Sequence, residues 1–317
     1  MLAEAQLPDV RDTSGAGDLL DIEAYHRGFY RCLALRSDGD PTHKYSAQFQ
    51  DALRTYFDSY GLLEHSRLSE WWADHLGARV AHAFNSFIPW CQGLSVNLEG
   101  ARVLEVGCGT GSSTVALAAH TDFVLACDIH LPSINAARIR LKEDGFAHKV
   151  TFIHIQPSSS KFVAHDEEFD VVILYGVVEH MLPSEREQLF RNVWKLLRRN
   201  GKLVLYETPN RLWPKDRHTT GLIGWSWLPP AWALRYGKWR GALDPETDLV
   251  KMYRLGFGLS YRELMKRLEE CEARYAIRFK YAREPFYQRA VIKTLTTLIR
   301  TPRWGFSENL NLVIEKL

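Results

Sequence analysis

The stretch that most constrains the fold is a short strand followed by three glycines at alternate positions. Residues 103–106 read Val-Leu-Glu-Val, and Gly107, Gly109 and Gly111 follow. Residues 112–120 then predict a helix that begins with hydroxyl-bearing side chains. Glycine lets the backbone turn tightly and lets a ligand approach without Cβ atoms in the way. Because a helix start also offers unpaired N–H groups and a positive dipole end, this unit is expected to form a cofactor cradle.

The spacing of the glycines discriminates between cofactors. It is Gly-x-Gly-x-Gly, whereas dinucleotide-binding proteins have Gly-x-Gly-x-x-Gly. This difference favours S-adenosylmethionine over NAD and makes an oxidoreductase the least favoured class. Asp128 lies 21 residues after Gly107, at the end of a predicted strand over 123–127, where a carboxylate is expected to bind the two ribose hydroxyls. Glu105 stands inside the first strand and needs polar partners, either N–H groups of the loop or the cofactor's ammonium.

From residue 101 onward the sequence alternates between strand and helix patterns. This alternation predicts an α/β fold with a mostly parallel sheet and helices on both faces. The expected strands are 102–106, 123–127, 150–155, 169–174, 202–207, 275–281 and 310–315. The expected helices between them are 133–143, 183–199, 260–272 and 289–300. The last two strands are expected to form a hairpin at the sheet edge.

The sequence divides into a polar start, a helical leader and the α/β part. Residues 1–20 predict a flexible tail, and 21–97 predict an N-terminal helical cap. The expected helices of the cap are 21–35, 45–60, 66–76, ended by Gly77, and 78–91. Residues 98–317 predict the catalytic domain, with a long tryptophan- and proline-containing insertion at 208–258 on the substrate side.

Three stretches closely resemble class I S-adenosylmethionine-dependent methyltransferases. They are 103–111, the Ala-Cys-Asp-Ile of 126–129, and 169–174 followed by Val-Val-Glu-His-Met at 177–181. The last stretch resembles the branch that includes ubiquinone-type O-methyltransferases. The resemblance covers about 100–208 and implies a Rossmann-like seven-stranded sheet whose last strand is antiparallel. It also implies S-adenosylmethionine as cofactor.

The resemblance implies a set of cofactor-binding residues. The three loop glycines are expected to hold the methionine moiety and Asp128 the ribose, and Gln156 stands where many relatives have an acid beside the adenine amine. The full expected set is Glu105, Gly107, Cys108, Gly109, Gly111, Asp128, Ile129, Gln156, Tyr175 and Gly176.

Two histidines are candidates for a catalytic base. His180 directly follows the fourth predicted strand, and its alternative role is to anchor that loop. His218 lies early in the insertion, where the roles of base, substrate contact and loop anchor stay equally open. No His, Asp or Glu cluster has metal-ligand spacing, so no metal is expected.

The charge distribution points to the C-terminal third. Residues 211–317 carry 20 Lys and Arg against 11 Asp and Glu, although the whole chain has a net charge of only +2. This excess favours an anionic substrate, an acidic partner or a lipid surface, and a solvated face without a partner carries equal weight. Tryptophans of the insertion and the neighbouring Arg211, Lys215, Arg217 and Arg235 favour a substrate with both an apolar and an anionic part.

Cysteine spacing, the start of the chain and the length of its uncharged runs bear on the cellular compartment of the protein. The five cysteines have no metal or redox spacing, and the start lacks a signal-peptide pattern. No uncharged run reaches the ~18 residues of a membrane helix. A cytoplasmic protein without a transmembrane segment is therefore expected, of undetermined oligomeric state.

Three functional hypotheses remain. The first is methyl transfer to an oxygen or nitrogen of a small molecule. The second is methylation of nucleic acid or protein, disfavoured for nucleic acid because the fourth strand ends in Tyr-Gly-Val-Val at 175–178, not in an Asn/Asp-Pro-Pro-Tyr tetrapeptide. The third is a non-catalytic S-adenosylmethionine-binding protein.

Overall fold

The computed structural model describes residues 45–155, 168–271, 274–279, 293, 296–297, 301–302 and 305–317. The chain divides into two compact units, Met1–Pro41 and Thr42–Leu317, and all described residues belong to the second. The expected tail over 1–20, the expected helix over 21–35, Gln156 and most of the expected helix over 289–300 lie outside the described residues.

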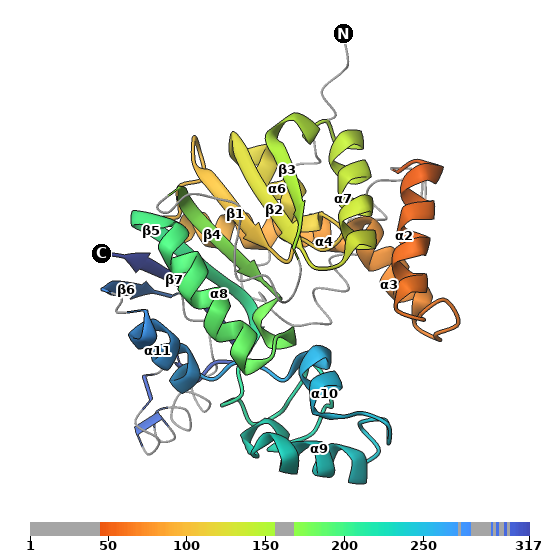
Figure 1. Cartoon of the computed structure of the whole chain (residues 1–317), viewed down its shortest axis with the longest axis vertical. Helices are drawn as coiled ribbons and strands as arrows, with labels where there is room; N and C mark the ends of the chain where they lie inside the picture. The colour runs from red at the N-terminus through yellow and green to blue at the C-terminus, as the bar shows by residue number, and fades with distance from the viewer. Residues whose placement is uncertain are drawn as a thin grey trace, which may run out of the picture. The chain divides into compact units, whose positions relative to one another are not determined.

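The described part of the chain contains one seven-stranded sheet in the order β3-β2-β1-β4-β5-β7-β6 (Figure 1). Its strands are β1 (Arg102–Val106), β2 (Phe123–Asp128), β3 (Val150–His154), β4 (Phe169–Tyr175), β5 (Leu197–Pro209), β6 (Tyr275–Arg278) and β7 (Asn309–Lys316). Strands β1 to β5 are parallel, β7 is antiparallel to β5, and β6 pairs antiparallel with β7 at the edge. The predicted fold class is therefore confirmed, together with the antiparallel last strand and the edge hairpin.

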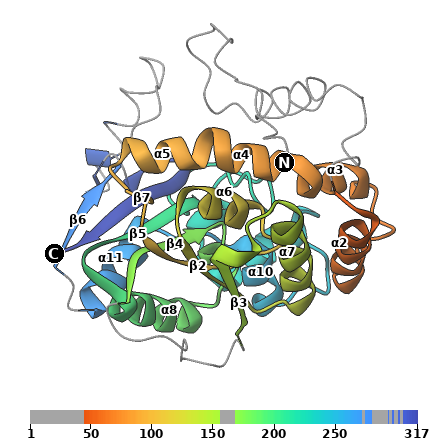
Figure 2. The same ribbon diagram turned by 90° about the horizontal axis from the view of Figure 1, so that it is seen from above.

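Helices cover both faces of the sheet, as Figure 2 shows. One face carries α3 (Leu68–Ala73), α4 (Arg79–His82), α5 (Ile88–Gly93), α6 (Ser112–His120) and α7 (Leu131–Glu143), and the other carries α8 (Pro183–Leu196) and α11 (Tyr261–Glu270). Short 3-10 turns lie at Ala147–Lys149 and Val178–His180. Alternation along β1 sends Val103 into the core beneath α6 and Leu104 into the core beneath α8, because successive side chains of a strand point to opposite faces.

The helical leader corrects one prediction. Residues 68–93 form one continuous helix, in which π-helical turns at Asp74–Ala78 and Ala83–Phe87 separate α3, α4 and α5. Gly77 was expected to end a helix, but it lies inside the first π turn. The neighbouring Leu76 and Ala78 are buried, and this packing offsets the roughly 1 kcal/mol that a helical glycine costs. Helix α2 (Ala47–Ser59) precedes this run and packs beside α7.

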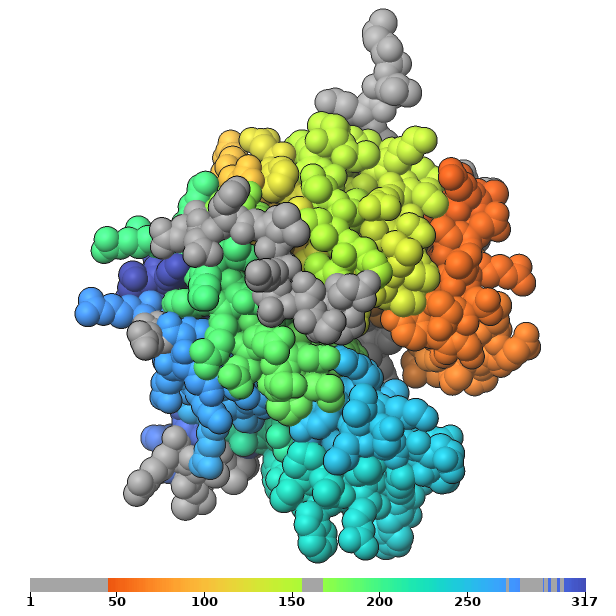
Figure 3. Space-filling model, viewed as in Figure 1, coloured from red at the N-terminus to blue at the C-terminus, as the bar shows by residue number. Residues whose placement is uncertain are grey.

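The insertion after β5 combines three helical segments with irregular chain. It contains a 3-10 turn (Trp225–Trp227), α9 (Pro230–Trp239) and α10 (Leu249–Gly256) around a small core of its own. Trp225 is buried there and donates from Nε1 to the Ala233 carbonyl at 2.8 Å, whereas Trp232 and Trp239 are exposed. In Figure 3 the cyan and teal atoms of this insertion lie beside the green atoms of α8. None of the helices in the described ranges has the length and apolar character needed to cross a membrane.

Candidate functional site

The glycine loop leaves β1 at Val106 in an unusual backbone conformation. Gly107, Gly109 and Gly111 have φ values of 76°, 51° and 82°, a region that side chains with a Cβ rarely adopt. A Cβ at Gly107 would lie 1.8 Å from Cγ2 of Val177, so this glycine is required for packing against the segment after β4. A Cβ at Gly109 would meet no atom within 4 Å. A Cβ at Gly111 would lie 3.0 Å from Cβ of Ala137, so the loop is packed at Gly107 and Gly111 and open at Gly109.

Asp128, at the end of β2, is tied to this loop. Its Oδ2 accepts a hydrogen bond from the Gly109 N–H at 2.8 Å, and its Oδ1 accepts from the His130 N–H at 2.9 Å. Each carboxylate oxygen keeps a second lone pair, so both can still accept from ligand hydroxyls. The sequence expectation placed Asp128 at the ribose, and the structure places its carboxylate beside the open glycine.

Glu105 has partners that sequence reasoning did not foresee. Its carboxylate is buried and accepts hydrogen bonds from the hydroxyls of Ser113 at 2.5 Å and Thr114 at 2.6 Å, in the first turn of α6. We expected loop N–H groups or a cofactor ammonium instead. Burial raises the pKa of Glu105 to about 7. The side chain thus joins β1 to α6 underneath the loop.

The helical leader also contacts the loop. His75 of the first π turn lies 3.0 Å, from Nδ1 to Oγ1, from Thr110. The buried Arg140 of α7 donates to the Ser112 hydroxyl at 2.7 Å and to the carbonyl of His75. Of the other expected cofactor residues, Cys108 is buried in the loop and Ile129 is 47% exposed just beyond Asp128.

The turn after β4 brings three titratable side chains together. Glu179, His180 and His218 offer ligand atoms that all lie within 4.8 Å of one another. The rings of His180 and His218 are 5.2 Å apart between centroids, and Nε2 of His180 lies 3.9 Å from Oε1 of Glu179. A Cβ at Gly256 would lie 2.5 Å from the His218 ring, so α10 must end in glycine for His218 to reach this position. This group could hold a metal ion, which the sequence spacing did not indicate because His218 lies in the distant insertion.

The protonation of His180 follows from its hydrogen bond. Its Nδ1 lies 2.8 Å from the carbonyl oxygen of Arg254, which can only accept, so Nδ1 carries the proton and Nε2 keeps a free lone pair. Burial, with the neighbouring His218, lowers the pKa of His180 to about 4, although its side chain is 40% exposed. Burial raises the pKa of Glu179 to about 8. At neutral pH this pair is therefore a neutral imidazole beside a protonated carboxyl.

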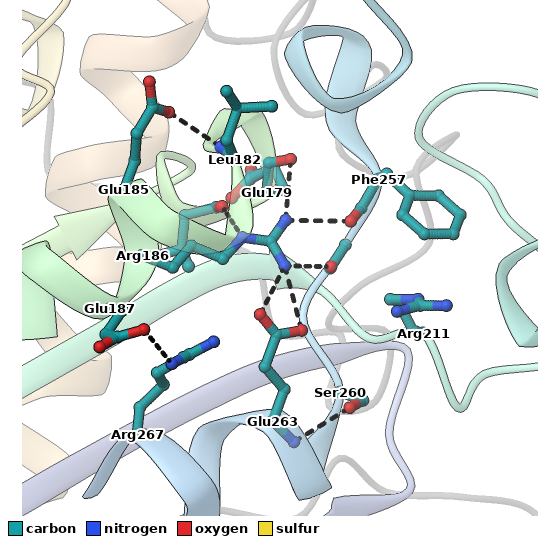
Figure 4. A network of polar contacts seen from close by, with 12 residues as sticks. Glu179, Leu182, Glu185, Arg186, Glu187, Arg211, Phe257, Ser260, Glu263 and Arg267 are labelled. Carbon is teal, nitrogen blue, oxygen red and sulfur yellow. Dashed lines mark hydrogen bonds and ion pairs between the residues drawn. The ribbon is translucent and has the colours of Figure 1, made fainter. Parts of the chain in front are cut away.

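A buried arginine holds this turn in place (Figure 4). Arg186 of α8 donates from Nε to the Val178 carbonyl at 2.9 Å and from Nη2 to the Glu179 carbonyl at 3.3 Å. The same guanidinium reaches the Phe257 carbonyl at 3.0 Å and the Glu263 carboxylate at 3.1 Å. Because these bonds span the segment after β4, the end of the insertion and α11, they fix the position of the Glu179–His180 backbone.

Charges around the turn come partly from the leader. Burial lowers the pKa of His180 and of His218, and the positive charge of Arg79 on α4 adds to this lowering. At the end of β4, the Tyr175 hydroxyl lies 2.6 Å from Nδ1 of His82, also on α4. Sequence reasoning did not single out Arg79 or His82, since a lone polar residue on a helix gives no signal of what it faces.

Comparisons with known proteins agree with this arrangement. The family model described as "Methyltransferase domain" matches residues 104–203. A ubiquinone biosynthesis O-methyltransferase of Aromatoleum aromaticum is 32% identical over 143 residues, 44% of this chain and 58% of the relative. One from Dechloromonas aromatica is 26% identical over 234 residues, 66% of this chain and 94% of the relative. The chain thus spans a little over half the length of the first curated relatives that it matches.

Among solved structures, magnesium protoporphyrin IX methyltransferase from Synechocystis PCC 6803, with bound SAH, has a TM-score of 0.46 and 20% identity. The match covers 73% of this chain and 94% of that structure. Together with the glycine loop, the family model and the curated relatives indicate that residues 104–203 form a methyltransferase domain. This domain is similar to those of class I S-adenosylmethionine-dependent methyltransferases.

Proposed function

We propose that this protein transfers a methyl group from S-adenosylmethionine to a hydroxyl or amino group of a small molecule. One observation carries the proposal. The open glycine loop after β1, the Asp128 carboxylate after β2 and the His180 imidazole after β4 lie along one edge of the sheet, on neighbouring strands. Ligands of open α/β sheets bind at this edge, outside the carboxyl ends of the strands.

The residues present fit the cofactor. Gly109 leaves open space against the backbone, the start of α6 supplies N–H groups for a carboxylate, and Asp128 supplies acceptors for two hydroxyls. Gly107, Cys108 and Gly111 would complete the cradle of the methionine moiety, with Ile129, Tyr175 and Gly176 on its borders. Bound S-adenosylmethionine supplies a methyl group already activated by its sulfonium. The remaining task of the chain is to align the acceptor and to take up its proton.

His180 is the proposed base. A hydroxyl acceptor would lose its proton to Nε2 while its oxygen bonds the methyl carbon and the carbon–sulfur bond breaks. Nε2 is available because Nδ1 is held by the Arg254 carbonyl. The protonated Glu179, 3.9 Å from Nε2, places no negative charge directly beside this nitrogen at neutral pH. His218, whose ring centroid lies 5.2 Å from that of His180, is the proposed acceptor contact.

The acceptor is proposed to be partly apolar and to carry an anionic group. Lys215 and Arg217 are exposed close to His218 in the chain, and exposed tryptophans lie on the same insertion. Arg211 is excluded from this role because its guanidinium lies 4.1 Å from the Phe257 ring and donates to the carbonyls of Ser226 and Leu228. The relatives' name, O-methyltransferase of ubiquinone biosynthesis, supports oxygen as the accepting atom.

Calorimetry with S-adenosylmethionine and SAH tests cofactor binding. Asp128→Asn should weaken SAH binding, whereas Asp170→Asn, a carboxylate at the opposite end of the sheet, should not. Absence of saturable binding at near-millimolar concentration would refute the proposal. Labelled cofactor supplied with phenols, hydroxybenzoates, amines, transfer RNA or a peptide mixture identifies the acceptor class. Label in RNA or peptides would support the macromolecular alternative, and no label in any product, metabolite extract included, would support a non-catalytic protein.

The role of His180 has its own test. His180→Gln should lower kcat about 10²-fold or more while SAH affinity stays within a factor of about two. Equal losses of turnover and of SAH binding would show that His180 is a loop anchor.

A further inference from the structure

An irregularity in β5 redirects one carboxylate. Leu205 pairs with Leu312 of β7, but the next pair is Thr208 with Leu310, so β5 holds one extra residue in this interval. Glu207 lies in it with φ at 54°. Such bulges turn a side chain away from the direction that strand alternation would give it, and they are frequent next to active sites.

Alternation shows where Glu207 would otherwise point. Leu203 and Leu205 belong to the core beneath α8, whereas Val204 and Tyr206 belong to the core beneath α6. A regular strand would send Glu207 to the α8 side, with Leu205. Instead its Oε1 lies 3.4 Å from Nε2 of His82, an α4 residue whose ring lies 6.1 Å from that of Tyr206. The bulge therefore carries the carboxylate across to the leader.

The redirected carboxylate stands at the proposed site. Its His82 partner is 7% exposed and lies 2.6 Å, from Nδ1, from the Tyr175 hydroxyl at the end of β4. Glu207 itself is 39% exposed. Glu207 lies near the end of β5, and Glu179 follows the end of the neighbouring parallel strand β4, so both residues lie at the same edge of the sheet.

Glu207 has a positive φ that its residue type does not favour. The other described non-glycine residues with positive φ are Ser95 and Asn200. Asn tolerates this region well, and Ser95 follows the end of α5, whereas Glu207 lies in a strand. Its N–H is satisfied by Oδ1 of Asn311 at 2.7 Å. Strained residues that persist in this way gather at functional sites.

We propose that Glu207, positioned by His82 and Tyr175, binds a second hydrogen-bond donor of the methyl acceptor, next to the group that His180 deprotonates. The inference rests on the proposed function and deepens it. It requires an acceptor with two donors, hydroxyl or ammonium, at the reacting end. The basic residues of the insertion then serve the remote, anionic end of the same molecule.

The test compares ligands that differ by one donor. Phenol, catechol and resorcinol are titrated against the SAH-loaded protein by NMR, and the measured quantity is the dissociation constant of phenol divided by that of the tighter dihydroxybenzene. We expect a ratio of about ten in the native protein, as for a hydrogen bond to a charged group. Glu207→Asn should reduce it to about one, and Asp170→Asn, a carboxylate that is 37% exposed, should leave it unchanged.

The melting temperature of the Glu207 variant distinguishes a role in ligand binding from a purely structural role. Asparagine tolerates positive φ, so Glu207→Asn should keep or raise the melting temperature while it abolishes the donor preference. A fall of several degrees, an unchanged ratio in this variant, or no preference in the native protein would overturn the inference. Native protein that binds SAH but shows no preference contradicts this inference alone, whereas native protein that does not bind SAH contradicts the proposed function as well.

Discussion

Gly109→Ala tests the cradle most directly, because the structure provides a matched control. Gly109 and Gly145 both have positive φ, 51° and 83°, and a Cβ at either would meet no atom within 4 Å. Alanine at each position should therefore cost a similar ~1–2 kcal/mol of folding free energy, from backbone strain alone. That corresponds to a fall in melting temperature of about 2–4 °C in both variants.

Only Gly109→Ala should lose the cofactor. Its Cβ would occupy the space where the ligand lies against the loop, so a backbone hydrogen bond to a charged ligand group would be lost, worth about 1.5–3 kcal/mol. SAH affinity measured by calorimetry should fall about tenfold to hundredfold. The control variant Gly145→Ala, in the turn after α7, should bind SAH with native affinity. If Gly109→Ala binds SAH within threefold of the native protein, the open space at Gly109 is not the cofactor cradle.

Three further predictions concern stability. Gly107→Ala should lower the melting temperature more than Gly109→Ala does, because its Cβ would overlap Cγ2 of Val177 at 1.8 Å; equal melting temperatures would contradict this. Arg186→Met should cost about 3–5 kcal/mol in denaturant unfolding, since it leaves buried carbonyls and a carboxylate without a partner, whereas Arg191→Met, in an exposed helical ion pair, should cost less than about 0.5 kcal/mol. The pKa of Glu179 is raised to about 8 from the usual 4.5. Between pH 4.5 and pH 8 the folded state therefore binds more protons than the unfolded state, and the stability that the protonated Glu179 contributes is lost as the pH rises through this range. Glu179→Gln should flatten that part of the pH–stability curve, and an unchanged slope would show that the carboxyl is ionised in the fold.

Local patterns were sufficient for the sheet and the glycine loop. Only glycine readily adopts the positive φ found at Gly107, Gly109 and Gly111. The spacing of these glycines in the sequence therefore predicted the loop. The position of Asp128 beside it followed from topology, because the carboxyl ends of neighbouring parallel strands meet at one edge. The helix break expected at Gly77 was wrong because packing outweighed the local preference of glycine.

The neighbours of the cradle were decided by tertiary structure. Glu105 accepts hydrogen bonds from two hydroxyls of α6, and Glu179 lies close to His218 of the insertion. Neither pairing has a local sequence signal. Both depend on how helices far along the chain lie on the sheet.

The sequence by itself determined the alternation of strands and helices, the glycine loop and the class of cofactor, because each of these depends on backbone conformations that short segments specify. Only the tertiary structure decided which side chains lie around the proposed acceptor site. His82 and Glu207 are 125 positions apart, and they meet because one extra residue in β5 reverses the direction of a side chain. Such a reversal arises from pairing with β7 and packing against α4, which are contacts between distant segments that no local pattern encodes.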